Sequence, residues 1–88
     1  MTFEEFKIQC ALGSLDNDTI YEIIESKSTC KEILIFLSKH EYFAVRAYVS
    51  YNPNTPIEIL KELSKDKDYD VRCSATTAIE GRRIKENK

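Results

Sequence analysis

An internal repeat, in which the stretch that begins at Thr29 recurs from Thr55, is the feature that most constrains how this chain can fold. A period within about 20–50 residues is typical of arrays in which one small supersecondary unit is copied and stacked. We therefore expect two copies packed side by side, with matched residues in equivalent environments. The matched pairs are Thr29 with Thr55, Ile33 with Ile59, Leu34 with Leu60, Leu37 with Leu63, Val45 with Val71 and Arg46 with Arg72.

Each copy has the pattern of two helices. In the second copy Ile59, Leu60 and Leu63 fall on one helical face, and their partners in the first copy do the same. Residues 52–54, Asn-Pro-Asn, end the helix before them, because the residue ahead of a proline is driven out of the α region. Asp68 is placed to cap the helix that follows. The repeat is therefore expected to be all helical.

Four Thr-x-x-Glu sequences, beginning at Thr2, Thr19, Thr29 and Thr55, predict helix starts. In such a capping box the threonine hydroxyl accepts an early backbone N–H, and the glutamate side chain reaches back to the N–H of the cap. Gly13 is suited to the C-terminal cap of the first helix. The apolar residues 33–37 lie nearly all round their helix, so we expect this helix to be central and covered on several sides.

Residues 45–66, VRAYVSYNPNTPIEILKELSKD, resemble a unit of the leucine-rich repeat variant family, which belongs with the HEAT-like α-solenoids. The shared features are Val-Arg at the start of one helix, Asn-Pro-Asn-Thr-Pro, spaced leucines and an Asp-rich turn. The match is strong over residues 45–72 and looser over residues 29–44. Thr77-Ala78 stands where another Asn-Pro is expected, which indicates that the array stops there or that the last helix is a cap.

This resemblance implies an all-α fold, a short right-handed α-solenoid of HEAT-like helical hairpins with about five or six helices. It also implies a surface that binds proteins or nucleic acid. We expect a single domain of 88 residues. Its expected parts are a degenerate N-terminal unit or cap at 1–28, repeats at 29–54 and 55–81, and a basic tail at 82–88.

Composition excludes several classes of protein. Apolar residues make up 42% of the chain and charged residues 32%, which is ordinary for a folded helical domain. No apolar run approaches the roughly 20 residues that span a bilayer. The first residues lack the basic and apolar segments of a signal peptide, so we expect a cytoplasmic protein without membrane contact.

The residues that carry most catalytic chemistry are scarce. His40 is the only histidine, so the sequence contains no recognisable catalytic triad or dyad. Cys10, Cys30 and Cys73 match no metal or redox spacing, and we expect them to be small buried apolar residues. We therefore expect no enzymatic activity, no cofactor and no metal site.

Arg46 and Arg72 occupy equivalent positions and allow two interpretations. They could form a ladder of guanidinium groups that binds carboxylate or phosphate. Alternatively, each could bind an aspartate of a neighbouring unit, at 66, 68 or 70, or the carbonyls of a helix end. We favour the second interpretation, which predicts that Arg72→Ala lowers the melting temperature.

Tyrosines gather around the helix of residues 43–51. The interpretation that they form an interaction surface follows from the enrichment of Tyr and Arg at interface hot spots. The alternative is that the rings only seal the ends of a small core. The tyrosines are Tyr42, Tyr48, Tyr51 and Tyr69, and the candidate partner-binding residues are Arg46, Tyr48, Tyr51, Asn52 and Arg72.

The most direct functional prediction is a non-enzymatic module that binds a protein partner. The alternative is nucleic-acid binding through the repeat arginines and the tail, where Arg82, Arg83, Lys85 and Lys88 lie. The net charge of −2 does not favour a globally basic nucleic-acid binder. Self-association is a further expectation, because a short array leaves apolar end faces open.

Overall fold

The computed structural model describes the backbone of residues 1–86 and the side chains of residues 1–83. Within residues 1–86 the chain forms six α-helices and no strand, so the predicted all-α class is confirmed. None of these helices is long and apolar enough to cross a membrane. The helices are α1 (Phe3–Ala11), α2 (Asn17–Glu25), α3 (Lys31–Leu37), α4 (Phe43–Val49), α5 (Ile57–Leu63) and α6 (Tyr69–Glu86).

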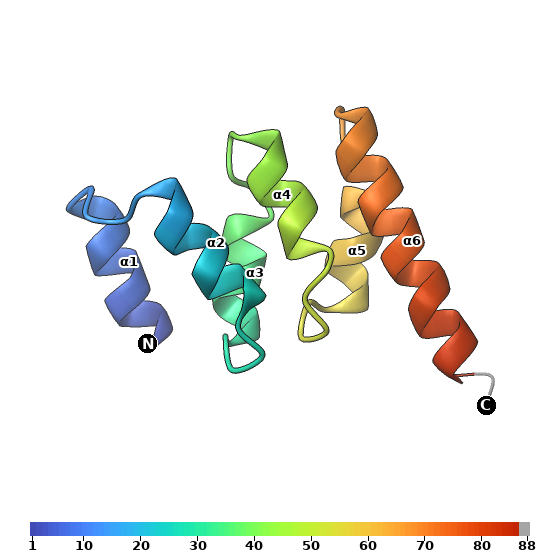
Figure 1. Ribbon diagram of the computed structural model, residues 1–88, viewed down its shortest axis with the longest axis horizontal. Coiled ribbons are helices and arrows are strands. Elements are labelled where there is room, and N and C mark those ends of the chain that lie inside the picture. The colour runs from blue at the N-terminus through green and yellow to red at the C-terminus, as the bar shows by residue number, and fades with distance from the viewer. Residues whose placement is uncertain (87–88) are drawn as a thin grey trace.

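The helices α2, α4 and α6 follow one another across the molecule, and α3 and α5 lie behind them (Figure 1). Helix α4 contacts α2, α3 and α6, and α5 packs on α6. Helix α1 lies at one end against α3. There the Phe36 ring meets the rings of Phe3 and Phe6 edge-on, at centroid distances of 6.2 and 5.7 Å.

The core is built from the residues that the repeat matches. Because they are apolar and spaced on one helical face, both copies turn the same side chains inward. The matched core residues are therefore buried in both copies. The buried pairs are Ile33 with Ile59, Leu34 with Leu60, Leu37 with Leu63 and Val45 with Val71.

The capping boxes predicted at Thr29 and Thr55 are wrong. Helices α3 and α5 begin after Cys30 and Pro56, and neither has a side-chain cap. The hydroxyls of Thr29 and Thr55 are buried and donate instead to the carbonyls of Ile23 and Val49, which also occupy equivalent positions in the repeat. A buried hydroxyl here satisfies a carbonyl at the end of the preceding helix, and that need outweighs capping.

Of the other predictions about helix ends, some are confirmed and one is wrong. Thr2 forms the predicted capping box with Glu5, and Gly13, at φ +69°, follows the C-cap of α1. The box at Thr19 is wrong, since this residue lies inside α2, whose cap is the Asp16 carboxylate. Asp68 accepts the N–H groups of residues 70 and 71, so its predicted capping role is confirmed.

Helix α3 is less covered than its sequence predicts. Phe36 is 44% exposed, and with Phe3 and Ile35 it lines an apolar groove of about 600 Å³. The helix contacts α1 and α4, but the side that carries Phe36 faces this groove. Helix α4 rather than α3 is therefore the central element, because it touches both of its neighbours in the front layer.

The C-terminal segment and the cysteines also differ from expectation. Residues 82–86 continue α6 instead of forming a frayed tail, while Lys88 lies outside the described residues. Cys73 is exposed, and Cys10 and Cys30 are only partly buried, so the prediction of buried cysteines is wrong. Cys10 and Cys30 pack at the margin of the core, and Cys73 lies beside Arg72 in a surface depression of α6.

Candidate interaction surface

The five predicted partner-binding residues do not form one site. Tyr48, Tyr51 and Asn52 lie together at the C-terminal end of α4, next to α2 and α6. Arg46 is buried between α4 and the loop before α6. Arg72 lines a separate depression on α6. The equivalence of the two arginines in sequence therefore does not make them parts of one surface.

Arg46 joins the two copies of the repeat. It is only 6% exposed. Its Nε and Nη2 donate to the two carboxylate oxygens of Asp66 at 2.9 and 3.1 Å, and its Nη1 donates to the carbonyls of His40 and Glu41 at 2.7 and 3.0 Å. For Arg46 this is the structural arrangement that the sequence favours, with both an aspartate of the next unit and helix-end carbonyls as acceptors.

The carboxylate of Asp66 is held in its charged form. Desolvation by burial raises its pKa, but the hydrogen bonds from Arg46 and from the Asp68 N–H, with the charges of Arg46 and Lys67, outweigh this. The pKa of Asp66 consequently lies below the ordinary value of 3.8. The ion pair between the repeat units is therefore formed at neutral pH.

Arg72 makes fewer bonds than Arg46. Its Nη1 donates to the carbonyl of Asp66 at 2.8 Å, which is the bond that Arg46 makes to His40 in the preceding copy of the repeat. Its guanidinium also lies 5.8 Å from the centre of the Tyr69 ring. No aspartate side chain binds it among the described residues, so the predicted pairing with Asp66, Asp68 or Asp70 is wrong for Arg72 except at the Asp66 carbonyl.

Three tyrosines form a row across the front layer. Tyr21 of α2 packs on Tyr48 of α4 at a centroid distance of 4.7 Å, and Tyr48 meets Tyr51 at 6.2 Å. The Tyr51 hydroxyl lies 2.9 Å from the Ser74 hydroxyl of α6. Tyr48 is 37% exposed and Tyr51 62% exposed, so this tyrosine row presents ring surface to solvent.

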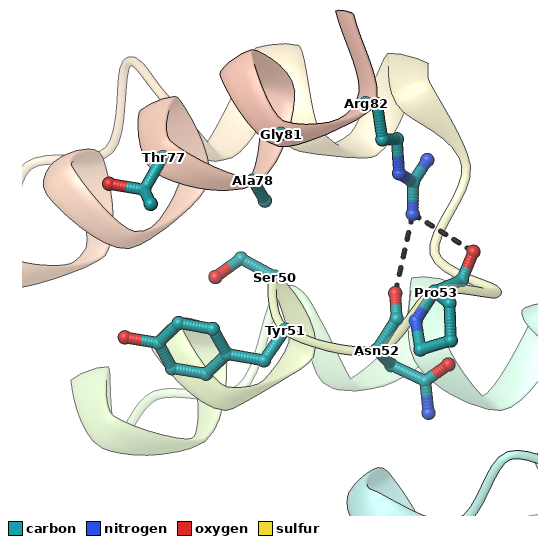
Figure 2. A pocket seen from close by; sticks show the side chains of 8 residues that line it. All are labelled: Ser50, Tyr51, Asn52, Pro53, Thr77, Ala78, Gly81 and Arg82. Carbon is teal, nitrogen blue, oxygen red and sulfur yellow. Dashed lines mark hydrogen bonds between the residues drawn. The ribbon is translucent and has the colours of Figure 1, made fainter. Parts of the chain in front are cut away.

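Two grooves flank the tyrosine row and meet at residues 51–53. One groove of about 430 Å³ lies between α2 and α4, and its rim carries Glu25 and Lys27. The other, of about 540 Å³, lies between α4 and α6 and ends at Arg82 (Figure 2). Both are lined by Tyr51, Asn52 and Pro53, so the two grooves adjoin at the turn that follows α4, and we call the pair the recess.

The floor of this recess is tied together by asparagines. Asn52 is 4% exposed, and its Nδ2 donates to the carbonyls of Ile24 and Ser26 at 2.5 and 3.0 Å. Asn54 donates to the carbonyl of Lys27 at 2.7 Å. The turn after α4 is thereby fastened to the turn after α2, which explains why polar residues occupy a buried position here.

Arg82 repeats this fastening one unit later. The carbonyls of Asn52 and Pro53 are the repeat equivalents of those of Ser26 and Lys27, and the Arg82 Nη2 donates to them at 3.3 and 3.0 Å (Figure 2). Ala78 stands where an asparagine would be expected. Because Arg82 follows it by one helical turn, the longer side chain reaches the same acceptors.

Replacing Arg82 with alanine is expected to lower the free energy of unfolding by about 1 kcal/mol, because a partly exposed, charge-assisted pair of bonds is lost. Urea denaturation followed by circular dichroism measures this change. Arg83→Ala is the matched control, since Arg83 is exposed and, among the described residues, forms an ion pair with Glu80 of its own helix at 3.6 Å. Equal stability of the two variants would contradict the fastening role of Arg82.

The chain was compared with family models, with curated proteins and with solved structures, and no match was found. The geometry of the side chains therefore carries the functional argument.

Two residues of this surface escaped prediction from the sequence. Tyr21 lies outside the strict repeat, and no periodic signal connects it with Tyr48. Arg82 was grouped with a basic tail, although its spacing of four from Ala78 could have placed it on the face that binds the preceding turn. Both contacts join helices far apart in the sequence.

Proposed function

We propose that this chain is a non-enzymatic interaction module that binds a protein partner through the tyrosine row. The single observation that carries the proposal is the pair of adjoining grooves beside α4, with the exposed rings of Tyr48 and Tyr51 along them. Rigid aromatic rings supply large contact area at a low entropic cost, which is why they are frequent at binding hot spots.

The polar groups of Asn52 and Tyr51 in the recess are already hydrogen-bonded within the chain. The recess therefore favours a partner that contacts it with side chains over one that requires free hydrogen-bond donors. The Asn52 amide is bonded to Ile24 and Ser26, and the Tyr51 hydroxyl to Ser74. What the recess offers is ring and carbon surface, bordered by charges of both signs. Apolar and cationic side chains of a protein suit such a surface, because rings bind both.

We also propose that the chain is a short HEAT-like solenoid related to leucine-rich repeat variants. The support is that residues one repeat apart make matching contacts. The hydroxyls of Thr29 and Thr55 bind equivalent carbonyls, and the Nη1 atoms of Arg46 and Arg72 do the same. Equivalent contacts of this kind are what stacked copies of one unit would make.

Nucleic-acid binding is the weaker alternative. It needs arginines that are free to contact phosphates, yet Arg46 is buried with its guanidinium bonded to acceptors within the chain, and Arg82 binds the turn after α4. The test is salt-dependent retention on RNA or DNA. The double substitution Arg83→Gln and Lys85→Gln lowers the positive charge of the C-terminal segment without breaking the Arg82 bonds.

Replacing Tyr48 with alanine is expected to weaken partner binding at least about tenfold, since one central ring of the row is removed. The partner is first captured through a photo-crosslinking residue at position 51, identified, and purified. Its affinity for the intact chain and for Tyr48→Ala is then measured by calorimetry. Leu12→Ala is the control, because the Leu12 side chain is 76% exposed and lines neither groove of the recess.

Two results would contradict the proposal. One is an equal loss of affinity in Tyr48→Ala and Leu12→Ala. The other is crosslinking that disappears after nuclease treatment, which would favour the nucleic-acid alternative. Self-association stays a separate prediction, and light scattering at several protein concentrations tests it.

A further inference from the structure

Arg46 shows how this fold holds a carboxylate. One edge of its guanidinium, Nη1, binds helix-end carbonyls and fixes the side chain. The other edge, Nε with Nη2, receives both oxygens of Asp66 from the loop of residues 64–68. Two parallel charge-assisted bonds in this form are the geometry in which arginine recognises a carboxylate best.

Arg72 presents the same fork, which is the guanidinium edge formed by Nε and Nη2. In Arg46 this edge binds Asp66, but in Arg72 it is open. Its Nη1 is fixed by the Asp66 carbonyl at 2.8 Å, as Arg46 is fixed by His40. Among the described residues no acceptor lies within bonding distance of its Nε or Nη2. The Arg72 guanidinium is therefore anchored at Nη1 and partly exposed, and among the described residues its Nε and Nη2 have no acceptor.

A shallow depression lies beside this fork. A depression of about 250 Å³ on the outer face of α6 is lined by the guanidinium and by exposed residues of the same helix. The Tyr69 ring lies 5.8 Å from the guanidinium and limits where it can move. The lining residues are Tyr69, Arg72, Cys73, Thr76 and Thr77.

We propose that Arg72 is a carboxylate-binding site for an acidic side chain of a partner polypeptide, which docks on the outer face of α6 as the loop of residues 64–68 docks on α4. The site lies outside the tyrosine row and does not depend on the function proposed for it. Its template is the Arg46–Asp66 pair of the same chain, which has equivalent anchoring and bidentate geometry.

A single carboxylate fits this fork better than a phosphate. Asp68 and Asp70 precede Arg72 closely in the chain, and their negative charges disfavour a dianion more than a monoanion. The ligand that fills the equivalent fork of Arg46 is also a carboxylate, that of Asp66.

The probe is the loop that fills the equivalent fork, as the peptide acetyl-Ser-Lys-Asp-Lys-Asp-amide, which copies residues 64–68. The readout is the side-chain Nε–H signal of Arg72 in nitrogen-15 labelled full-length protein. We expect a saturable shift of this signal with the peptide. A control peptide with asparagine in place of its first aspartate should bind about tenfold more weakly, because the bidentate acceptor is lost. The Arg46 signal should stay unchanged.

Variants make the assignment specific. Arg72→Lys should abolish the saturable peptide-dependent shifts of the backbone N–H signals of Cys73 and Thr76, and Arg83→Lys should not. Thr76→Glu places a carboxylate one helical turn from Arg72, where it can occupy the fork, so it should block the peptide, whereas Thr76→Gln should not. This pair stays informative if Arg72→Lys fails to fold.

Four outcomes would overturn the proposal. They are no shift of the Arg72 signal, equal shifts with both peptides, an unchanged response in Thr76→Glu, and a tighter response to inorganic phosphate or an RNA oligomer than to the peptide.

Discussion

Arg46→Ala is expected to lower the free energy of unfolding by about 3–5 kcal/mol, because it leaves the Asp66 carboxylate largely buried without its cation. Two carbonyls that follow α3, those of His40 and Glu41, lose their donor in the same step. Single domains are stable by only about 5–15 kcal/mol, so this variant should lose a large share of its stability.

Urea denaturation followed by circular dichroism measures the effect. Arg83→Ala is the control, since the Arg83–Glu80 pair is exposed at 3.6 Å and such pairs contribute about 0–1 kcal/mol. Asp66→Asn alone and combined with Arg46→Ala completes a double-mutant cycle. A loss for Arg46→Ala no larger than that of the control would refute the joining role of the pair.

The same pair makes stability depend on pH. Because the folded-state pKa of Asp66 is depressed below 3.8, its contribution is fully present above that ordinary value. It is lost as the pH falls through the lower folded-state pKa. Asp66→Asn should therefore flatten part of the stability decline below about pH 4.

Asn52→Ala is expected to lower the free energy of unfolding by about 2–4 kcal/mol, because one buried and two partly buried hydrogen bonds are lost together. The carbonyls of Ile24 and Ser26 lose their donor, and the N–H of Asn54 loses its acceptor at 2.8 Å. Water cannot readily replace the amide, since Asn52 is enclosed between the turns that follow α2 and α4.

Thermal unfolding of Asn52→Ala and Asn54→Ala separates this role from a general effect on the turn. Asn54 is exposed, and its bonds to the carbonyls of Lys27 and Thr29 are open to water. We expect its loss to cost about 1 kcal/mol. If Asn54→Ala were the more destabilising variant, the buried Asn52 amide would not be the main fastening between units.

The threonines show where local patterns mislead. Thr29 and Thr55 have the spacing of capping boxes, and the same spacing at Thr2 does form one. The difference is burial. An exposed hydroxyl is free to cap its own helix, whereas the buried hydroxyls of Thr29 and Thr55 donate to carbonyls at the end of the preceding helix. Spacing alone carries no information about burial.

Arg46 and Arg72 show a second limit. The sequence places them in equivalent positions, and both anchor an Nη1 atom in the same way. Their receiving edges differ because a loop covers one and no described side chain binds the other. The repeat in the sequence therefore predicts that both arginines bind acceptors within the chain. It does not predict which of them also binds a carboxylate.

The sequence by itself determined the helical class, the spacing of the units and the buried pairs such as Leu34 with Leu60, because periodic apolar residues specify which face of a helix leaves water. Only the tertiary structure decided that Tyr21 joins Tyr48, that Arg82 takes the place of an asparagine, and that no described carboxylate fills the fork of Arg72. These contacts join side chains of different helices, and their existence depends on how the helices pack, which no local spacing records.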